Sequence, residues 1–160
     1  QEVGAQCEPG STIYLLGGTA LGFLGGSRPT VDLDYVGSDV KVTMFQELLS
    51  QIADEMQLEI EAVPIDEFVP VPSGANERAI FIEAFGNLNV YVIDPYTIAL
   101  SKIDRGFDTD IEDVVFLCRN GFVDMDRFVQ MIETAVAQAA QFDLDPQAMQ
   151  RHLQAVQKSL

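Results

Sequence analysis

The sequence is poor in the residues that most often build metal and catalytic centres. Its 160 residues include two cysteines, one histidine and no tryptophan. Cys7 and Cys118 lie far apart and match no metal-ligand spacing. His152 stands alone in a polar C-terminal segment, which argues against a zinc site or a histidine-based triad. Any reactive centre is therefore expected to use other side chains.

Positive charge is also scarce. The chain has 9 lysines and arginines against 25 aspartates and glutamates, a formal net charge of −16 at pH 7. Broad, sequence-independent DNA binding depends on basic side chains that neutralise phosphates, so we expect none. A nucleotide site stays compatible with this charge, because a bound divalent cation supplies the missing positive charge.

Long apolar runs are absent as well. No run reaches the ~18 residues of a membrane span, and no basic segment followed by an apolar stretch opens the chain. Hydrophobic residues nevertheless make up 48% of the sequence, which indicates a folded core. We expect a cytoplasmic protein with no membrane partner.

The spacing of apolar residues predicts an α/β core of mixed strands followed by helices. Strands are predicted at 12–18, 30–36, 57–63, 79–85 and 88–93, helices at 19–25, 43–56, 95–104, 109–119, 124–141 and 146–159, and a loop at 64–78. Gly86-Asn87 is a hairpin signal, and Asp94-Pro95 and Asp145-Pro146 are helix-start signals. We expect residues 1–94 to form the core and residues 95–160 a helical region that completes the site.

Two carboxylates interrupt the second of these strands. Asp32 and Asp34 alternate with Val31, Leu33 and Tyr35, so both aspartates lie on one face of the strand. Ionised carboxylates near a core are costly unless they are paired. A bound Mg²⁺ or Mn²⁺ would keep both ionised, since hard cations take oxygen ligands. The structural alternative is an edge strand whose aspartate face meets water.

The order of the motifs in this region resembles the nucleotidyltransferase superfamily, with its palm of the DNA polymerase β type. A strand leads to Gly17-Gly18, a short helix and then Asp32-Leu33-Asp34 on a second strand. The pattern "GGTAL…R-x-T-x-DhD" is most similar to the AbiEii-type branch, which includes toxins of type IV toxin–antitoxin systems. The resemblance implies a palm of mixed sheet with flanking helices. It also implies an enzyme that moves a nucleotidyl group from an NTP to an RNA or protein hydroxyl with Mg²⁺ or Mn²⁺.

A second block strengthens the resemblance. "DPYTIALSKIDRGFDTDIEDVVFL", residues 94–117, is similar to a branch pattern of a lysine-bearing helix, an arginine and a helix with Asp-x-x-Asp. Lys102, Arg105, Asp110 and Asp113 occupy the matching positions, although Thr109 stands where relatives often carry arginine. The resemblance implies that Lys102 clamps the triphosphate and that Asp110 or Asp113 positions the acceptor. The alternative for the two aspartates is a solvated face that complements the helix dipole.

The remaining nucleotide contacts are expected from the glycine-rich stretch. Gly17, Gly18 and Thr19 would hold the phosphates, because glycines let backbone N–H groups approach them closely. Arg28 would pair with an aspartate of the acidic strand or contact a phosphate.

The superfamily commonly uses a third metal-binding carboxylate, and three residues compete for that role here. Glu61 lies on the strand after the second helix, Glu83 interrupts an apolar strand, and Asp94 ends the last strand. Glu83 is the predicted third metal ligand beside Asp32 and Asp34. The alternative for Glu83 is an exposed strand face, and the alternative for Asp94 is an ordinary helix N-cap.

The expected partners are an NTP, a tRNA or protein acceptor, and an antitoxin. A tRNA acceptor fits poorly with a charge of −16 unless basic residues cluster or a partner helps. Two other hypotheses remain open. The chain would be a catalytically degenerate module that binds a nucleotide or a partner, or a component that acts only inside a complex through its helical half.

Overall fold

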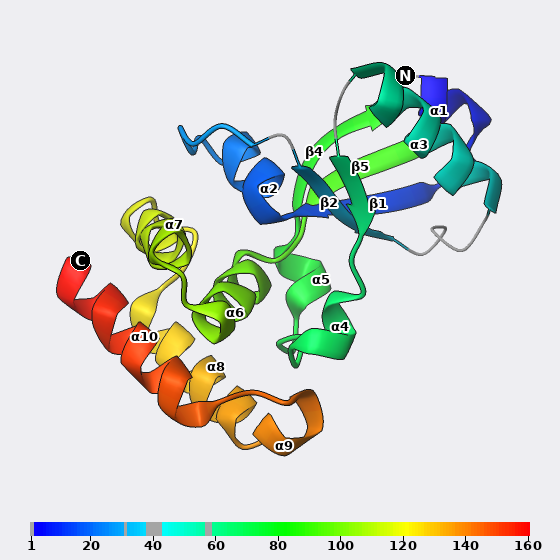
Figure 1. Cartoon of the computed structure of the whole chain (residues 1–160). Coiled ribbons are helices and arrows are strands. Elements are labelled where there is room, and N and C mark those ends of the chain that lie inside the picture. The colour runs from blue at the N-terminus through cyan, green and yellow to red at the C-terminus, as the bar shows by residue number, and fades with distance from the viewer. Residues whose placement is uncertain (1, 31, 38–42, 57–58) are drawn as a thin grey trace. The chain divides into compact units, whose positions relative to one another are not determined.

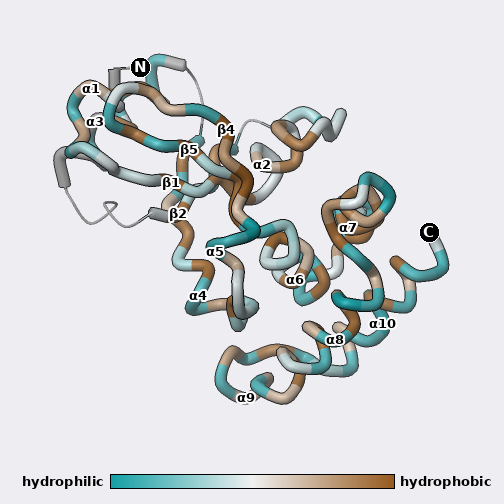
Figure 2. The backbone as a smooth tube through the Cα atoms, turned by 180° about the vertical axis from the view of Figure 1, so that it is seen from behind, coloured by the Kyte–Doolittle hydropathy of each residue, from teal (hydrophilic) through white to brown (hydrophobic). Residues whose placement is uncertain are grey.

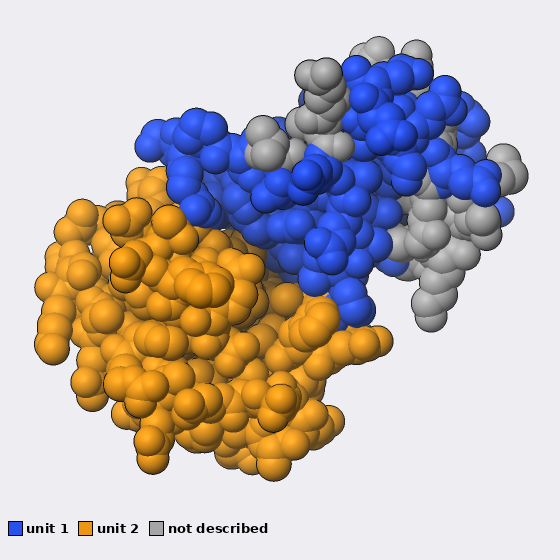
Figure 3. All heavy atoms as spheres, in the orientation of Figure 1, with its two compact units in different colours: residues 1–64, 79–93 blue, residues 65–78, 94–160 orange. Residues whose placement is uncertain are grey.

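The computed structural model describes residues 2–30, 32–37, 43–56 and 59–160. The chain divides into two compact units, coloured separately in Figure 3. Residues 1–64 and 79–93 form the sheet unit, and residues 65–78 and 94–160 form the helical unit. The segment 65–78 lies between two strands in the sequence, yet it belongs to the helical unit.

A five-stranded mixed sheet forms the centre of the sheet unit (Figure 1). Its strands are β1 Ser11–Leu16, β2 Asp32–Gly37, β3 Glu59–Ala62, β4 Ile80–Phe85 and β5 Leu88–Val92. Their order across the sheet is β3-β2-β1-β5-β4. β1 runs parallel to β5 and antiparallel to β2, while β2 is parallel to β3 and β4 is antiparallel to β5. The predicted α/β fold with a mixed sheet and a helical C-terminal region is confirmed.

One face of this sheet carries the core of the unit. The helices α1 Glu2–Gln6 and α3 Thr43–Met56 contact each other and the sheet, and α2 Gly17–Phe23 packs on β1 and β2. Strand alternation directs one set of side chains to the buried face: Ile13, Leu15, Tyr35, Val90 and Val92. The tube in Figure 2 shows apolar stretches along β4 and β5. The opposite face is less buried and carries the predicted aspartates.

The helical unit is built from helices alone. They are α4 Ile65–Phe68, α5 Ala75–Arg78, α6 Pro95–Arg105, α7 Asp108–Arg119, α8 Met125–Val136, α9 Ala139–Phe142 and α10 Pro146–Ser159. α10 packs against α6, α7 and α8, and the largest core side chains are Leu100, Ile103, Leu117, Phe128, Ile132 and Met149. Among the described residues, no helix combines the length and the apolar character that crossing a bilayer requires.

Most predicted elements are confirmed, and three differ. The segment predicted as a loop at 64–78 contains α4 and α5, and its Val69 is almost fully buried. The helix predicted at 124–141 ends at Val136 and resumes as α9. Gly17 and Gly18 form the first turn of α2 rather than a turn before it. Tertiary packing, which periodicity does not report, decides such short helices.

Both predicted helix starts are confirmed. Asp94 caps α6, with its carboxylate accepting a hydrogen bond from the Tyr96 N–H. Asp145 caps α10 and accepts hydrogen bonds from the N–H groups of Gln147 and Ala148. In each case proline follows at the first helical position, where its missing N–H leaves no hydrogen bond unmade.

Asp94 also fixes the segment 65–78 to α6. The carboxylate is fully buried, and Arg78 donates to both of its oxygens, Nε to Oδ1 at 2.8 Å and Nη2 to Oδ2 at 2.7 Å. The hydrogen bond to Asp94 raises the pKa of Arg78. Thr97 Oγ1 adds a third side-chain donor at 3.1 Å. This bidentate pair holds the C-terminal end of α5 against the start of α6.

The Arg78–Asp94 pair yields a stability prediction. In Arg78→Met, the buried Asp94 carboxylate loses its charged partner, so we expect the free energy of unfolding to fall by about 3 kcal/mol. Urea denaturation followed by far-UV circular dichroism measures this. Arg119→Met is the control, because Arg119 contacts an exposed carbonyl oxygen of Ser159. The control is expected to change stability by less than about 0.5 kcal/mol, and equal effects of the two variants would contradict the prediction.

Candidate functional site

Asp32 and Asp34 project from one face of β2, as predicted. Asp34 is opposite Leu16 of β1 and beside Glu61 of β3, and Asp32 is beside Glu59. Residues in register on neighbouring strands share a face of the sheet. Four residues with carboxylate side chains therefore share one face of β2 and β3, at the end of the sheet where β1 enters α2.

Gly17 has its Cα directly beside the Asp34 carboxylate. It has a left-handed backbone with φ of 63°, and a Cβ at this position would overlap Oδ2 of Asp34. Any other residue would meet both backbone strain and a steric clash. The glycine pair and the aspartate pair are predicted from the sequence to share one site, and the structure brings Gly17 and Asp34 together.

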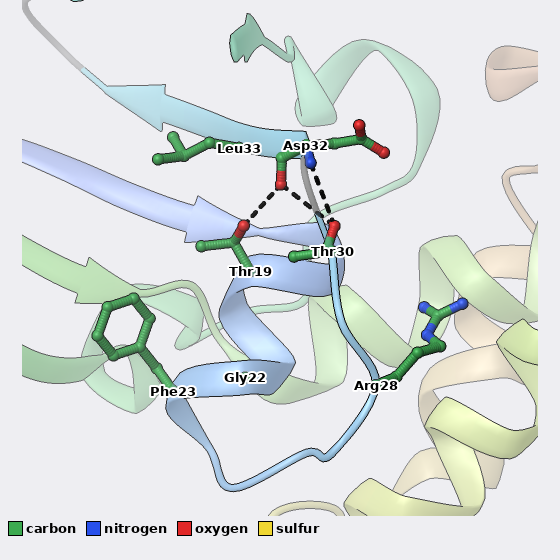
Figure 4. A pocket seen from close by; sticks show the side chains of 7 residues that line it. All are labelled: Thr19, Gly22, Phe23, Arg28, Thr30, Asp32 and Leu33. Carbon is green, nitrogen blue, oxygen red and sulfur yellow. Dashed lines mark hydrogen bonds between the residues drawn. The ribbon is translucent and has the colours of Figure 1, made fainter. Parts of the chain in front are cut away.

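Two threonine hydroxyls hold the start of β2. Thr19 Oγ1 donates to the Asp32 carbonyl oxygen at 2.6 Å, and the Asp32 N–H donates to Thr30 Oγ1 at 3.3 Å. Figure 4 shows both hydroxyls directed at the Asp32 backbone. Thr19 was predicted to hold phosphates. In the structure its hydroxyl is engaged in fixing the strand that carries the aspartates.

A pocket of about 400 Å³ opens beside these threonines. Its lining residues are Thr19, Gly22, Phe23, Arg28, Thr30, Asp32 and Leu33. In Figure 4, Phe23 and Leu33 lie on one side of the threonines, while Arg28 and the Asp32 carboxylate lie on the other. The pocket therefore has an apolar side and a charged side.

Several of these lining residues were missed in the sequence. Phe23 is an apolar position of a short helix and Leu33 reads as a core residue, so neither carries a signal of its own. The one available signal for Phe23 is its 56% exposure, which only the folded structure reveals. Arg28 was predicted, and the structure places it in the pocket with Asp32.

The predicted third carboxylate, Glu83, lies on the wrong strand. It belongs to β4, and both β1 and β5 stand between β4 and β2. Strands are about 4.8 Å apart, so Glu83 is about 14 Å from the aspartates across the sheet. That distance excludes a shared cation. Asp94 is engaged by Arg78 and by its N-cap contacts, so Glu61 is the candidate that the strand order favours.

The carboxylates of β2 suit a magnesium ion that is bound together with a nucleotide better than a metal site whose ligands all come from the protein. In the part of the chain that the structure describes, no group of three or more histidine, cysteine, aspartate or glutamate side chains is already gathered to hold a metal ion. Mg²⁺ commonly binds through one or two carboxylates and takes its other ligands from substrate phosphates and water. Asp32 and Asp34 would supply that pair of oxygen ligands.

A second polar cluster lies in the helical unit. Lys102 of α6 donates to Asp110 Oδ1 at 3.0 Å and to Asp113 Oδ2 at 2.6 Å, both on α7. Arg105 donates to the same Asp110 oxygen at 2.7 Å. The Lys102 side chain is only 2% exposed. The predicted motif residues are thus brought together, and we call these four residues the Lys102 cluster.

Asp110 is the most constrained member of this cluster. Burial raises the pKa of Asp110, but hydrogen bonds from Arg105 and Lys102 lower the pKa more, and it lies below the usual range. Its other oxygen, Oδ2, is buried and has no hydrogen-bond partner among the described residues. Asp110 is therefore a carboxylate held ionised with one acceptor position left to fill.

This geometry changes the role expected for Lys102. A triphosphate clamp needs an ammonium group that reaches solvent, whereas the Lys102 ammonium already binds two carboxylates in a buried setting. As placed, it orders Asp110 and Asp113 on one face of α7. The solvated-face alternative does not fit either aspartate, since both are buried.

α10 packs against the turn between α6 and α7. His152 of α10 lies with Nδ1 2.7 Å from the Ile103 carbonyl oxygen. Its ring covers Gly106, where φ is 67° and a Cβ would overlap the imidazole. The lone histidine is thus a packing residue of the helical unit.

The Lys102 cluster yields a pH-dependent stability prediction. In wild type, the lowered pKa of Asp110 means that its stabilising contribution is complete above its unfolded pKa and is lost only in stronger acid. In Lys102→Met, the buried Asp110 carboxylate loses one of its two cationic partners, which raises the pKa of Asp110 and makes its protonation in acid less costly to the folded state. We expect a loss of about 3 kcal/mol near neutral pH that shrinks as the pH falls.

Urea denaturation at about pH 7.5 and about pH 4.5 measures this change in the stability deficit. Lys158→Met, at the exposed end of α10, is the matched control and should leave stability nearly unchanged at both pH values. If Lys102→Met lowered the free energy of unfolding equally at the two pH values, the prediction would be wrong, because the loss would not depend on the ionisation of the cluster.

A known protein family matches this chain. The family described as a nucleotidyltransferase of unknown function (DUF6036) matches residues 5–159. No curated protein and no solved structure matches the chain. The family match includes both polar clusters and nearly the whole sequence. The protein therefore belongs to this family of nucleotidyltransferases.

Proposed function

We propose that the protein transfers a nucleotidyl group from an NTP to a hydroxyl of an RNA or protein acceptor, with Mg²⁺ or Mn²⁺ as cofactor. The observation that carries this proposal is the contact between Gly17 and the Asp34 carboxylate. It sets a pair of strand carboxylates beside the first turn of α2, next to an open pocket. The family membership supports the reaction class.

Asp32 and Asp34 would hold the cation, with Glu61 of β3 as the third carboxylate. When bound, the cation neutralises phosphate charge and stabilises the negative charge that develops as the nucleotidyl group transfers. The protein's own part is to fix the carboxylates. Thr19 and Thr30 hold the backbone of β2, and β1 and β3 hold it from either side.

The pocket beside α2 would receive the nucleotide. Arg28 offers a guanidinium for phosphate oxygens, and planar guanidinium groups bind phosphate in a bidentate manner. The backbone of Gly17 and Gly18 would approach the phosphates, because neither residue has a side chain that shields it. Phe23 and Leu33 offer the apolar side of the pocket.

The Lys102 cluster would position the acceptor. Of the two aspartates, Asp113 is the more exposed, with a side chain 12% exposed against 3% for Asp110, so Asp113 would be the one to accept a hydrogen bond from the acceptor hydroxyl. Lys102 donates to both carboxylates, and Lys102 and Arg105 keep Asp110 ionised at neutral pH. We therefore assign Lys102 a positioning role in place of the triphosphate clamp.

We further propose a toxin-like role and an antitoxin partner. They rest on the motif "GGTAL…R-x-T-x-DhD" and on the second block at 94–117. One observation favours the alternative of a degenerate binding module: the Lys102 ammonium is sealed between two carboxylates and does not reach solvent.

The metal assignment is tested with Asp32→Asn, Asp34→Asn and the double variant. Losing cation ligands removes several kcal/mol of charge stabilisation, so transfer should fall by at least about 100-fold. Purified protein is incubated with Mg²⁺, an α-labelled NTP and cell extract, and label in RNA and protein is counted. Mg²⁺-dependent binding of a fluorescent NTP is measured in parallel. Asp54→Asn, an exposed aspartate of α3, is the control and should behave as wild type.

Two results would revise the proposal. Unchanged Mg²⁺-dependent NTP binding in the double variant would overturn the metal assignment. Wild type that binds NTP but labels no acceptor would favour the binding module over the enzyme.

A further inference from the structure

Three aromatic side chains form a row across the sheet. Tyr14 of β1 is in register with Tyr91 of β5, which is in register with Phe81 of β4. The ring centroids of Tyr14 and Tyr91 are 5.5 Å apart, and those of Phe81 and Tyr91 are 5.3 Å apart. Tyr14 and Tyr91 are half-buried and Phe81 is 54% exposed, so the rings present surface to solvent. We call these three residues the aromatic row.

The aromatic row shares its face of the sheet with the carboxylates of β2 and β3. Leu16 of β1 is opposite Asp34, and Tyr14 precedes Leu16 by two residues, so both side chains belong to that face. Tyr14 is therefore the diagonal neighbour of Asp34, at roughly 7–8 Å. Glu61 of β3 is beside Asp34. The same face thus carries aromatic rings at one side and carboxylates at the other.

No strand supplies a basic side chain to this face. The five strands lie wholly within the described residues, and they contain no lysine, arginine or histidine. Asp32, Glu59 and Glu61 are exposed. The other positions on this side of the sheet are uncharged: Thr12, Val36, Ala84 and Asn89. Because the face of an aromatic ring carries partial negative charge, both parts of this surface are complementary to positive charge.

Charge decides between the candidate occupants of this face. The phosphates of a nucleic acid would meet exposed carboxylates with no basic group from the strands to neutralise them. A second copy of the chain would bring the same net charge of −16, and the two copies would repel each other. Lysine and arginine side chains, in contrast, are attracted by aromatic rings and by carboxylates alike.

We propose that this face docks a protein segment rich in lysine and arginine, whose side chains lie over the aromatic row and pair with the carboxylates of β2 and β3. The inference goes beyond the proposed function and does not depend on nucleotidyl transfer. Neighbouring strands are about 4.8 Å apart, so the sheet is about 19 Å wide. An extended chain covers about 3.3 Å per residue, so a segment of about six residues crosses the face.

The test uses a fluorescein-labelled peptide in which lysine and arginine alternate with serine and glycine. A length of about ten residues is enough to cross the face. Binding to the full chain is measured by fluorescence anisotropy without Mg²⁺ or nucleotide, so the result does not depend on the transfer reaction. Wild type should bind this peptide, and it should bind much more weakly a second peptide that has glutamine at every basic position.

Variants of the aromatic row test the contribution of the rings. Tyr91→Leu and Phe81→Leu keep an apolar side chain but remove the ring, and each should weaken binding by about 2-fold to 30-fold, the range for a cation over an aromatic ring. Tyr91→Phe keeps the ring and should bind nearly as wild type. Phe68→Leu is the matched control, since Phe68 of α4 is also 54% exposed but belongs to the helical unit, and it should leave the affinity unchanged.

Variants of the acidic residues test the contribution of charge. Glu59→Gln combined with Glu61→Gln should weaken binding and make it less sensitive to salt between about 50 and 200 mM. Asp66→Asn combined with Glu67→Gln removes the same charge from exposed positions of α4. This control should leave the affinity nearly unchanged, which separates the sheet face from the net charge of the whole chain.

Several outcomes would overturn the proposal. They are no binding of the basic peptide by wild type, equal affinity for the glutamine peptide, unchanged affinity in both ring variants, and equal effects of the two double charge variants. Tighter binding of a short single-stranded RNA than of the peptide, weakened by the ring variants, would assign the face to RNA instead. A dimer in sedimentation velocity that the ring variants dissociate would assign the face to a second copy of the chain.

Discussion

The Asp34 carboxylate occupies the space that a side chain at position 17 would need, and the candidate site depends on that exclusion. A strand that ends in an ordinary residue would push β2 away or turn Asp34 aside. With Gly17 in a left-handed conformation, β1 passes directly into α2 while the carboxylate stays against the backbone. Thr19, in the same helix, then fixes the start of β2 by donating a hydrogen bond to the Asp32 carbonyl oxygen. The helix, the two strands and the two aspartates are therefore fixed by a single close approach.

The carboxylates of β2 and β3 and the Lys102 cluster differ in how their charges are balanced. The aspartates of β2 share their face with Glu59 and Glu61, and because Asp32, Glu59 and Glu61 are exposed, this face presents negative charge to solvent. The Lys102 cluster is already internally paired, with two cations facing two carboxylates in a largely buried setting. One cluster is suited to recruit a positive ion, and the other to present an ordered carboxylate. Part of the net charge of −16 thus lies on β2 and β3, where it would attract a cation.

Features set by neighbouring residues were predictable from the sequence, and features set by the order of strands were not. Alternation placed Asp32 and Asp34 on one face, and cap chemistry fixed the starts of α6 and α10. The choice of Glu83 failed because nothing local reveals that two strands separate β4 from β2. Lys102 was correctly grouped with Asp110 and Asp113, but its burial depends on how α7 packs on α6. The Arg78–Asp94 pair joins two residues of the helical unit that are 16 apart in the sequence and separated by two strands of the sheet unit, and no periodicity marks it.

The strand order has a consequence for how the chain is made. β5 is the last strand in the sequence, yet it lies in the interior of the sheet beside β1, the first. While the ribosome is still synthesising the chain, β1 can pair with β2 but keeps an open edge until residue 92 has emerged. Over that interval an apolar strand offers unpaired N–H and C=O groups to any other chain nearby. The segment 65–78 likewise emerges before Asp94, the partner that fixes it. The nascent chain would thus complete the sheet unit once residues 88–92 have appeared, whereas the helical unit also needs the helices that follow Asp94.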